Sequence, residues 1–194
     1  MKFSAVILAG GQSRRMGRDK AWLLVEGKPL IARQIALARK IGAAEVFISG
    51  RAGTDYRALE CPVLVDRVEN AGPLAGTEAA LAASSTPLLL VLAVDLANMT
   101  APVLQLLAAA CTPTCGAVPR VAGQIEPLAA FYPRTALEIA RAQLDTGSYA
   151  VRDFAARCVE LNLARFVDLP AHHAANFANW NTPADQTSPL APSS

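Results

Sequence analysis

Paired glycines and four cations follow a mostly apolar segment near the start of the chain. Residues 3–9 are mostly apolar, and the sequence then reads Gly10-Gly11-Gln12-Ser13-Arg14-Arg15-Met16-Gly17-Arg18-Asp19-Lys20. Glycine has no Cβ, so backbone N–H groups can approach an anion closely, while arginine and lysine supply charge-assisted donors. The pattern predicts a phosphate-binding loop at the carboxyl end of a strand, with a solvated basic turn as the alternative.

A second candidate residue, Asp95, directly follows the apolar run 88–94. Such a run is typical of a strand buried in the middle of a parallel sheet. A carboxylate at the carboxyl end of that strand lies where open α/β sheets bind ligands, and its burial is costly without a partner. The alternative is an N-cap, but the next helix is expected to start around Pro102, too far away. Asp95 is therefore predicted to bind Mg²⁺ or Mn²⁺.

The glycine spacing matches neither the dinucleotide fingerprint nor the P-loop. Residues 8–20 instead fill every fixed position of L-A-G-G-x-S-x-R-M-G-x-D-K. In this block the chain resembles the nucleotidyltransferases that attach GMP to molybdopterin. Three further segments match patterns of that family: G-P-L-A-G at 72–76, E-P-L-x-A-x-Y at 126–132 and N-x-N-T-P at 179–183. Two of these also have structural readings, as a helix-starting turn with Pro73 at N1 and as a capping box over 182–185.

The resemblance implies a reaction and a metal. The terminal phosphate of molybdopterin, or of the molybdenum cofactor, would attack the α-phosphorus of GTP, release pyrophosphate and form a guanine dinucleotide cofactor. The family binds its metal through an Asp in a D-x-P sequence, whereas here Asp95-Leu96-Ala97 lacks the proline. Because proline fixes φ, we expect this loop to be less rigid than in the family.

The resemblance also implies roles for individual residues. The catalytic residues would be Arg15, Lys20 and Asp95, and Asp95 would also bind the metal. The nucleotide site would consist of Leu8, Ala9, Gly10, Gly11, Lys20, Ser49, Asp66, Gly76 and Asp95, with the backbone N–H groups of Gly10 and Gly11 cradling the triphosphate. The acceptor site would include Glu126, Asn179 and Asn181. A phosphate monoester, with a second pKa of about 6, is already ionised at neutral pH, so no catalytic base is required.

Asp66 and Gly10 bear on the choice of base. A carboxylate at Asp66 can accept paired hydrogen bonds from guanine N1–H and the exocyclic amine, whereas cytosine offers only its amine. The alternative for Asp66 is a solvated acid beside Arg67 and Glu69. CTP-using relatives tend to carry L-A-A-G where this chain has Gly10, so the resemblance favours GTP. Ser49 aligns with a nucleotide-contacting Asn in some relatives.

Other functions stay open at this stage. One is CMP transfer from CTP to the same acceptor, and a more distant one is sugar-1-phosphate nucleotidyl transfer. A third is a non-catalytic protein that binds the molybdenum cofactor and delivers it, which the altered loop at Ala97-Asn98 keeps in view. Delivery to apo-molybdoenzymes would add protein partners in any of these cases.

The remaining pattern predicts the fold class. Apolar strands alternate with amphipathic segments, as in a mostly parallel sheet covered by helices on both faces. Expected strands are 3–8, 45–49, 63–65, 88–94, 117–118 and 128–132, with a closing strand or pair in 158–163 and 166–169; expected helices are 30–41, 77–83, 103–110, 135–144 and 149–156. We therefore expect one α/β, Rossmann-like nucleotidyltransferase domain over 1–185, its first half binding nucleotide and its second half acceptor. Residues 186–194, rich in Ser, Thr and Pro, are expected to be a disordered tail.

Composition limits the possible partners. The 194 residues carry 18 Lys and Arg against 16 Asp and Glu, a net charge of +2, which argues against an electrostatically driven nucleic-acid binder. Mean hydropathy is +0.29, but the longest uninterrupted apolar run, 88–94, is far too short to span a membrane. The four cysteines are scattered, so reduced thiols in the cytoplasm are expected rather than a zinc site. The opening cations follow the first apolar segment, unlike the order in a signal peptide.

Overall fold

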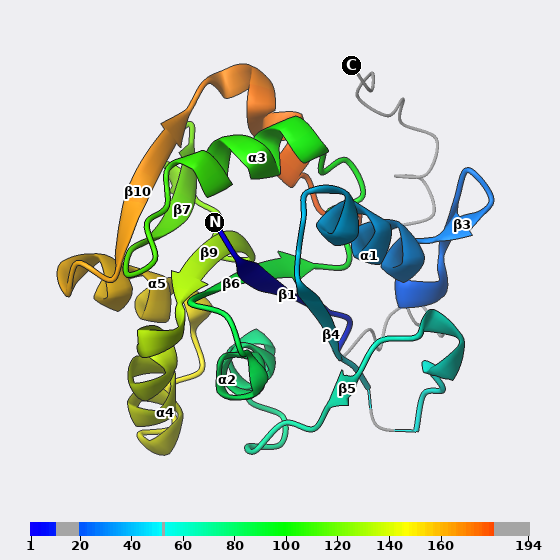
Figure 1. The fold of residues 1–194 in the computed structure, drawn as a ribbon, viewed down its shortest axis with the longest axis horizontal. Coiled ribbons are helices and arrows are strands. Elements are labelled where there is room, and N and C mark those ends of the chain that lie inside the picture. The colour runs from blue at the N-terminus through cyan, green and yellow to red at the C-terminus, as the bar shows by residue number, and fades with distance from the viewer. Residues whose placement is uncertain (11–19, 52, 181–194) are drawn as a thin grey trace.

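The computed structural model describes residues 1–10, 20–51 and 53–180, and its centre is a mixed β-sheet (Figure 1). In the described part the sheet has eight strands in the order β10-β7-β9-β6-β1-β4-β5, with β8 paired to β7. Their bounds are β1 (Phe3–Leu8), β4 (Glu45–Ser49), β5 (Val63–Leu64), β6 (Leu88–Ala93), β7 (Gly116–Val121), β8 (Gln124–Ile125), β9 (Ala129–Pro133) and β10 (Ala164–Leu169). Strands β6, β1, β4 and β5 run parallel, β10 is parallel to β7, and β9 is antiparallel to both of its neighbours. The expected α/β class with a mostly parallel sheet is confirmed.

Helices cover both faces of the sheet (Figure 1). On one face lie α1 (Leu30–Lys40) and α3 (Ala101–Ala109), and on the other α2 (Pro73–Ala83), α4 (Leu137–Asp145) and α5 (Val151–Glu160). Successive residues of a strand point to opposite faces, so Ala5 and Ile7 of β1 join one core cluster while Val6 and Leu8 join the other. This double burial explains why the central strands are continuous apolar runs.

Several boundaries differ from the sequence predictions. Helix α2 begins at Pro73 rather than Thr77, because Pro73 occupies the first helical turn and Gly72, with φ of 67°, precedes it. The strand predicted over 158–163 is wrong: residues 158–160 belong to α5, where Val151, Phe154, Ala155 and Cys158 are buried on one helical face. The strands at 3–8 and 45–49 have the predicted bounds, and most of the other helix and strand ends shift by a few residues.

Several short elements were not anticipated. Strands β2 (Leu24–Val25) and β3 (Lys28–Pro29) form a hairpin, with Glu26 and Gly27 at positive φ in its turn. Short 3₁₀ helices include η1 (Lys20–Trp22) and η4 (Ala171–Phe177).

The predicted tail at 186–194 and the end of the predicted domain at 185 lie outside the described residues. Over the part of the chain that is described, no helix combines the length and apolar character needed to cross a membrane.

Candidate active site

Three parallel strands bring their carboxyl ends to one edge of the sheet. Leu8 of β1 is in register with Ser49 of β4 on one side and with Ala93 of β6 on the other. The N–H groups of Ala9 and Gly10 both donate to the Ser49 carbonyl, at 2.8 and 3.0 Å, and Val94 N–H donates to the Leu8 carbonyl at 3.1 Å. The start of the glycine-rich loop therefore lies between β4 and β6, where α/β sheets bind ligands.

These contacts bear on one expectation about the loop. The Gly10 N–H is engaged by the Ser49 carbonyl, so it is not directed at a phosphate in this structure. Gly11 and Arg15, which were predicted to bind the triphosphate, lie outside the described residues. Of the predicted phosphate ligands, the structure thus describes Lys20 and the backbone as far as Gly10.

Lys20 and Asp95 form an ion pair at this edge. Lys20 Nζ, from η1, lies 3.5 Å from Asp95 Oδ2, just after β6, and their side chains are 20% and 25% exposed. The N-cap of α3 is Thr100, so Asp95 does not cap that helix, as predicted. A cation and a carboxylate that are both accessible to solvent can each turn to a charged ligand: Lys20 to phosphate oxygens, and Asp95 to a divalent cation.

The loop after Asp95 is braced by other elements. Gln34 Nε2 of α1 donates to the Leu96 carbonyl at 2.7 Å, and Asn176 Nδ2 of η4 donates to the Asn98 carbonyl at 2.8 Å. Trp180 N–H donates to the Asp95 carbonyl at 2.9 Å. The loop lacks the family's proline, and three long-range hydrogen bonds restrain its backbone.

Asp66 lies beyond β5 and contacts the end of β4. Ser49 Oγ donates to Asp66 Oδ1 at 3.4 Å. Partial burial raises the pKa of Asp66 above its usual value; the hydrogen bond from Ser49 opposes this rise, and the negative charge of Glu78 adds to it. Asp66 is therefore a partly buried acid held by a neighbouring strand, and not the solvated acid of the alternative reading.

Gly76 allows α2 to approach these strands closely. A Cβ at Gly76 would lie 2.2 Å from Ser49 Oγ, 2.7 Å from Ser49 Cβ and 2.9 Å from Leu8 Cδ2. Real Cβ atoms do not pack at such distances, so glycine is required for this geometry. Gly76 thus fixes the place of Ser49, which in turn contacts Asp66.

Of the three predicted acceptor residues, the structure describes Glu126 and Asn179. Residues 126–128 lead into β9, and the Ala93 N–H donates to the Leu128 carbonyl at 2.8 Å. Glu126 is partly buried, and burial raises its pKa, with the positive charge of Arg152 acting in the opposite direction. Asn179 is exposed and precedes Trp180, whose N–H binds the Asp95 carbonyl. Asn181 lies outside the described residues.

The sequence predictions did not include the buried residues Gln34 and Asn176, which hydrogen-bond the loop after Asp95. Gln34 is 3% exposed on the apolar face of α1, and Asn176 is 6% exposed at the end of η4. A lone amide at position i+4 from Leu30, within an apolar stripe, was a signal that this side chain has a buried partner. Glu78, an acid within the otherwise apolar α2, was a similar signal.

The family match identifies the chain as a nucleotidyltransferase. Residues 5–161 match the model of the MobA-like NTP transferase domain, and the chain belongs to that family. The fold also superposes on a nucleotidyl transferase from Methanothermobacter with a TM-score of 0.77 and 18% identity, over 94% of this chain and 93% of that one.

Two relatives narrow the family. The chain is 41% identical over 186 residues to a probable molybdenum cofactor guanylyltransferase from Opitutus terrae, covering 94% of this chain and 92% of that protein. It is 32% identical over 190 residues to a protein of the same description from Pelotomaculum thermopropionicum, with 95% and 90% covered. The chain belongs to the molybdenum cofactor guanylyltransferase family.

Proposed function

We propose that the residues at the carboxyl ends of β1, β4 and β6 perform GMP transfer from GTP to the terminal phosphate of molybdopterin. The observation that carries this assignment is the Lys20–Asp95 pair, 3.5 Å apart at the sheet edge where the glycine-rich segment also begins. The Lys20 cation binds the triphosphate and the Asp95 carboxylate binds the metal. This pair therefore supplies both charged groups that the reaction needs.

Guanine is assigned to the end of the site formed by Ser49 and Asp66. The Asp66 carboxylate accepts hydrogen bonds from guanine N1–H and the exocyclic amine, and the Ser49 hydroxyl holds that carboxylate in place. Charge-assisted hydrogen bonds of this kind are about twice as strong as neutral ones. Because cytosine offers only an amine at the corresponding edge, the same carboxylate favours GTP over CTP.

The chemistry needs neutralisation and alignment more than proton transfer. An oxygen of the molybdopterin phosphate attacks the α-phosphorus of GTP, the bond from that phosphorus to the bridging oxygen breaks, and pyrophosphate leaves. The attacking phosphate is already ionised, so the barrier comes largely from repulsion between anions. Lys20 and Arg15 are assigned to neutralise the triphosphate, and Glu126, Asn179 and Asn181 to bind the acceptor.

Asp95 is the proposed metal ligand. No cluster of three or more His, Cys, Asp or Glu side chains suited to a metal occurs in the described ranges. A single accessible carboxylate fits Mg²⁺ or Mn²⁺ in this setting, because Mg²⁺ is commonly bound by one or two carboxylates together with substrate phosphates. Such an ion supplies positive charge to the phosphate oxygens during transfer.

A direct assay tests the proposal. Purified protein, α-labelled GTP, Mg²⁺ and molybdopterin are expected to give labelled dinucleotide cofactor and one pyrophosphate per transfer, and CTP is expected to react far more slowly. Binding of GTP and acceptor without pyrophosphate would support a delivery protein instead. Equal use of CTP would overturn the assignment of the base.

We also propose that the protein acts in the cytoplasm. The described cysteines, Cys61, Cys111, Cys115 and Cys158, carry free thiols, which is the usual state in a reducing compartment. Fractionation of the source cells, with activity assayed in each fraction, tests this assignment. Pull-down from the same extract tests for the cofactor-biosynthesis or delivery partners.

A further inference from the structure

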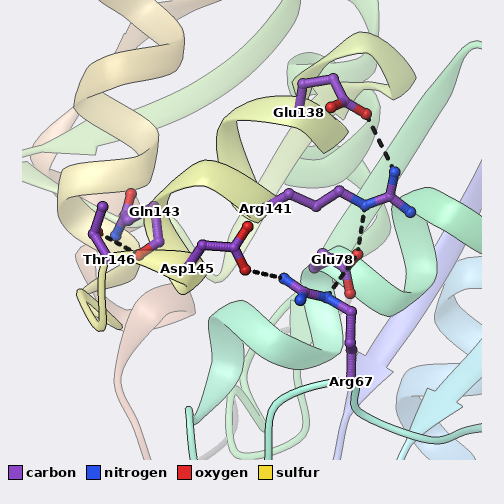
Figure 2. A network of polar contacts seen from close by, with 7 residues as sticks. All are labelled: Arg67, Glu78, Glu138, Arg141, Gln143, Asp145 and Thr146. Atoms are coloured by element: carbon purple, nitrogen blue, oxygen red, sulfur yellow. Dashed lines mark hydrogen bonds and ion pairs between the residues drawn. The ribbon is translucent and has the colours of Figure 1, made fainter.

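A network of five charged side chains joins the segment after β5 to α2 and α4 (Figure 2). Arg67 Nε lies 3.7 Å from Glu78 Oε1, and Arg67 Nη2 lies 2.9 Å from Asp145 Oδ1. Arg141 Nε lies 3.0 Å from the same Glu78 oxygen, and Arg141 Nη1 lies 3.3 Å from Glu138 Oε1. Both arginines therefore converge on Glu78.

Glu78 is the buried centre of this network. Its side chain is 3% exposed, whereas those of Arg67 and Arg141 are 46% and 42% exposed. A carboxylate removed from water needs charged hydrogen-bonding partners to stay ionised at acceptable cost. Glu78 sits in α2, two residues after Gly76, so its position is fixed by the same helix that packs against Ser49.

Arg67 directly follows Asp66, on a short segment at the edge of the sheet. Strand β5 has two residues and lies at the edge of the sheet. Around it, Val63 is 47% exposed and Val65 is 89% exposed, whereas Leu64 and Val68 are partly buried against the core cluster that includes α2. The Asp66 carboxylate is tied to the sheet through Ser49, at 3.4 Å, while the next residue is tied to α2 and α4 through Arg67.

We propose that the Arg67–Glu78 pair is a positioning device for base recognition, which holds Asp66 at the angle needed to accept both guanine hydrogen bonds. The inference rests on the proposed function, in which Asp66 reads guanine. Arg67 and Glu78 do not contact the base; they act through the backbone that carries Asp66. Arg141 completes the charge balance of Glu78 from α4, without being adjacent to Asp66.

Discrimination between GTP and ITP measures this role, because hypoxanthine lacks the exocyclic amine and offers only N1–H. With Asp66 correctly placed, the missing hydrogen bond is expected to lower kcat/KM for ITP by about 10- to 100-fold relative to GTP. In Arg67→Ala we expect kcat/KM for GTP to exceed that for ITP by no more than about threefold, because KM for GTP rises while kcat stays nearly unchanged. Arg67→Lys, which keeps the charge, is expected to restore part of the ratio.

Arg141→Ala is the matched control. The substitution removes the other arginine partner of Glu78, whose exposure is similar to that of Arg67. It is expected to lower the thermal midpoint as much as Arg67→Ala does, while the ratio of kcat/KM for GTP to kcat/KM for ITP stays at the wild-type value. A wild-type ratio in Arg67→Ala, or an equal loss in Arg141→Ala, would overturn the inference.

Asp66→Asn separates the positioning role of Arg67 from the proposed function of Asp66. If Asp66→Asn lowers the ratio and Arg67→Ala does not, only the positioning role fails; if Asp66→Asn keeps the ratio, reading of guanine by Asp66 fails as well.

Discussion

Replacing Gly76 with alanine inserts a methyl group where α2 meets the ends of β1 and β4. The new Cβ would lie 2.2 Å from Ser49 Oγ and 2.9 Å from Leu8 Cδ2, and Ser49 and Leu8 are only 4% and 6% exposed. Neither side chain can move into solvent without disturbing the strands. Ser49 must therefore shift or change rotamer, and its hydrogen bond to Asp66 Oδ1 is expected to break.

The size of the effect follows from two opposing contributions. Alanine inside a helix is favoured over glycine by about 1 kcal/mol, whereas forcing a methyl group into a packed site costs about 1–3 kcal/mol and often more at such short distances. We expect a net loss of about 1–2 kcal/mol in the free energy of unfolding, which for a chain of this size lowers Tm by about 2–8 °C. Displacement of Ser49 is expected to raise KM for GTP by about tenfold.

Thermal unfolding and steady-state kinetics with varied GTP measure both effects. Gly10→Ala is the control for stability, because a Cβ there would lie no closer than 3.6 Å to its nearest neighbour, the Gly50 carbonyl oxygen. That variant is expected to unfold at nearly the wild-type temperature. If Gly76→Ala is as stable as wild type and has the same KM for GTP, the close packing of α2 on Ser49 does not control the base site.

Four further outcomes are expected. Lys20→Ala should lose most transfer activity but keep its fold by circular dichroism, since Lys20 and its partner Asp95 are both partly exposed. Asp95→Asn should still bind GTP in calorimetry but lose the Mg²⁺ dependence of turnover, because an amide oxygen is a weaker ligand than a carboxylate. Gly10→Ala should narrow the GTP-over-CTP preference in kcat/KM, by about 1–3 kcal/mol, by crowding the purine. GTP affinity should weaken as pH falls through the raised pKa of Asp66, and Ser49→Ala should move this loss to higher pH, because the Ser49 hydrogen bond lowers that pKa.

Matched surface variants control for loss of charge. Arg157→Ala breaks an exposed pair with Glu160 on α5, and Asp168→Asn breaks an exposed pair with Arg120 on the β10 edge. Both should keep wild-type activity. Near-normal turnover in Lys20→Ala, or an unchanged Mg²⁺ titration in Asp95→Asn, would contradict the assigned roles. An unchanged nucleotide preference in Gly10→Ala would contradict the prediction for that variant. Titration of Asp66 at an ordinary acidic pH would contradict the predicted pH dependence of GTP affinity.

Much of the architecture could be predicted from local patterns. The strands at 3–8 and 45–49 have the predicted bounds, because apolar runs buried on both faces are unmistakable along the chain. The predicted strand at 158–163 failed because six residues with apolar side chains at Val159, Leu161 and Leu163 do not by themselves distinguish a strand from the end of an amphipathic helix. The antiparallel insertion of β9 between β6 and β7 was also beyond reach, since strand order depends on contacts between distant segments.

Part of the candidate site could likewise be predicted from the sequence, and part could not. Lys20 and Asp95 were identified from residue type and position after a strand, and the structure brings them within 3.5 Å. Support for the loop after Asp95 could not be predicted, because it comes from Gln34 and Asn176, which are far from it in sequence. The Gly10 N–H was expected to face phosphate, but the neighbouring strand offers it a carbonyl instead.

Sequence alone predicted which chemistry this protein carries: glycines and cations after one apolar strand, and a carboxylate after another, predict a site for phosphate and metal where the two strand ends meet. Tertiary structure decided how the residues proposed to hold the base are arranged. Ser49, Asp66 and Gly76 come from three separate elements, and only the close packing of α2 on β4 makes a hydroxyl, a carboxylate and a missing methyl group act together. The physical reason is that residue type sets charge and hydrogen-bonding capacity, whereas distance and burial, which set their strength, arise from packing.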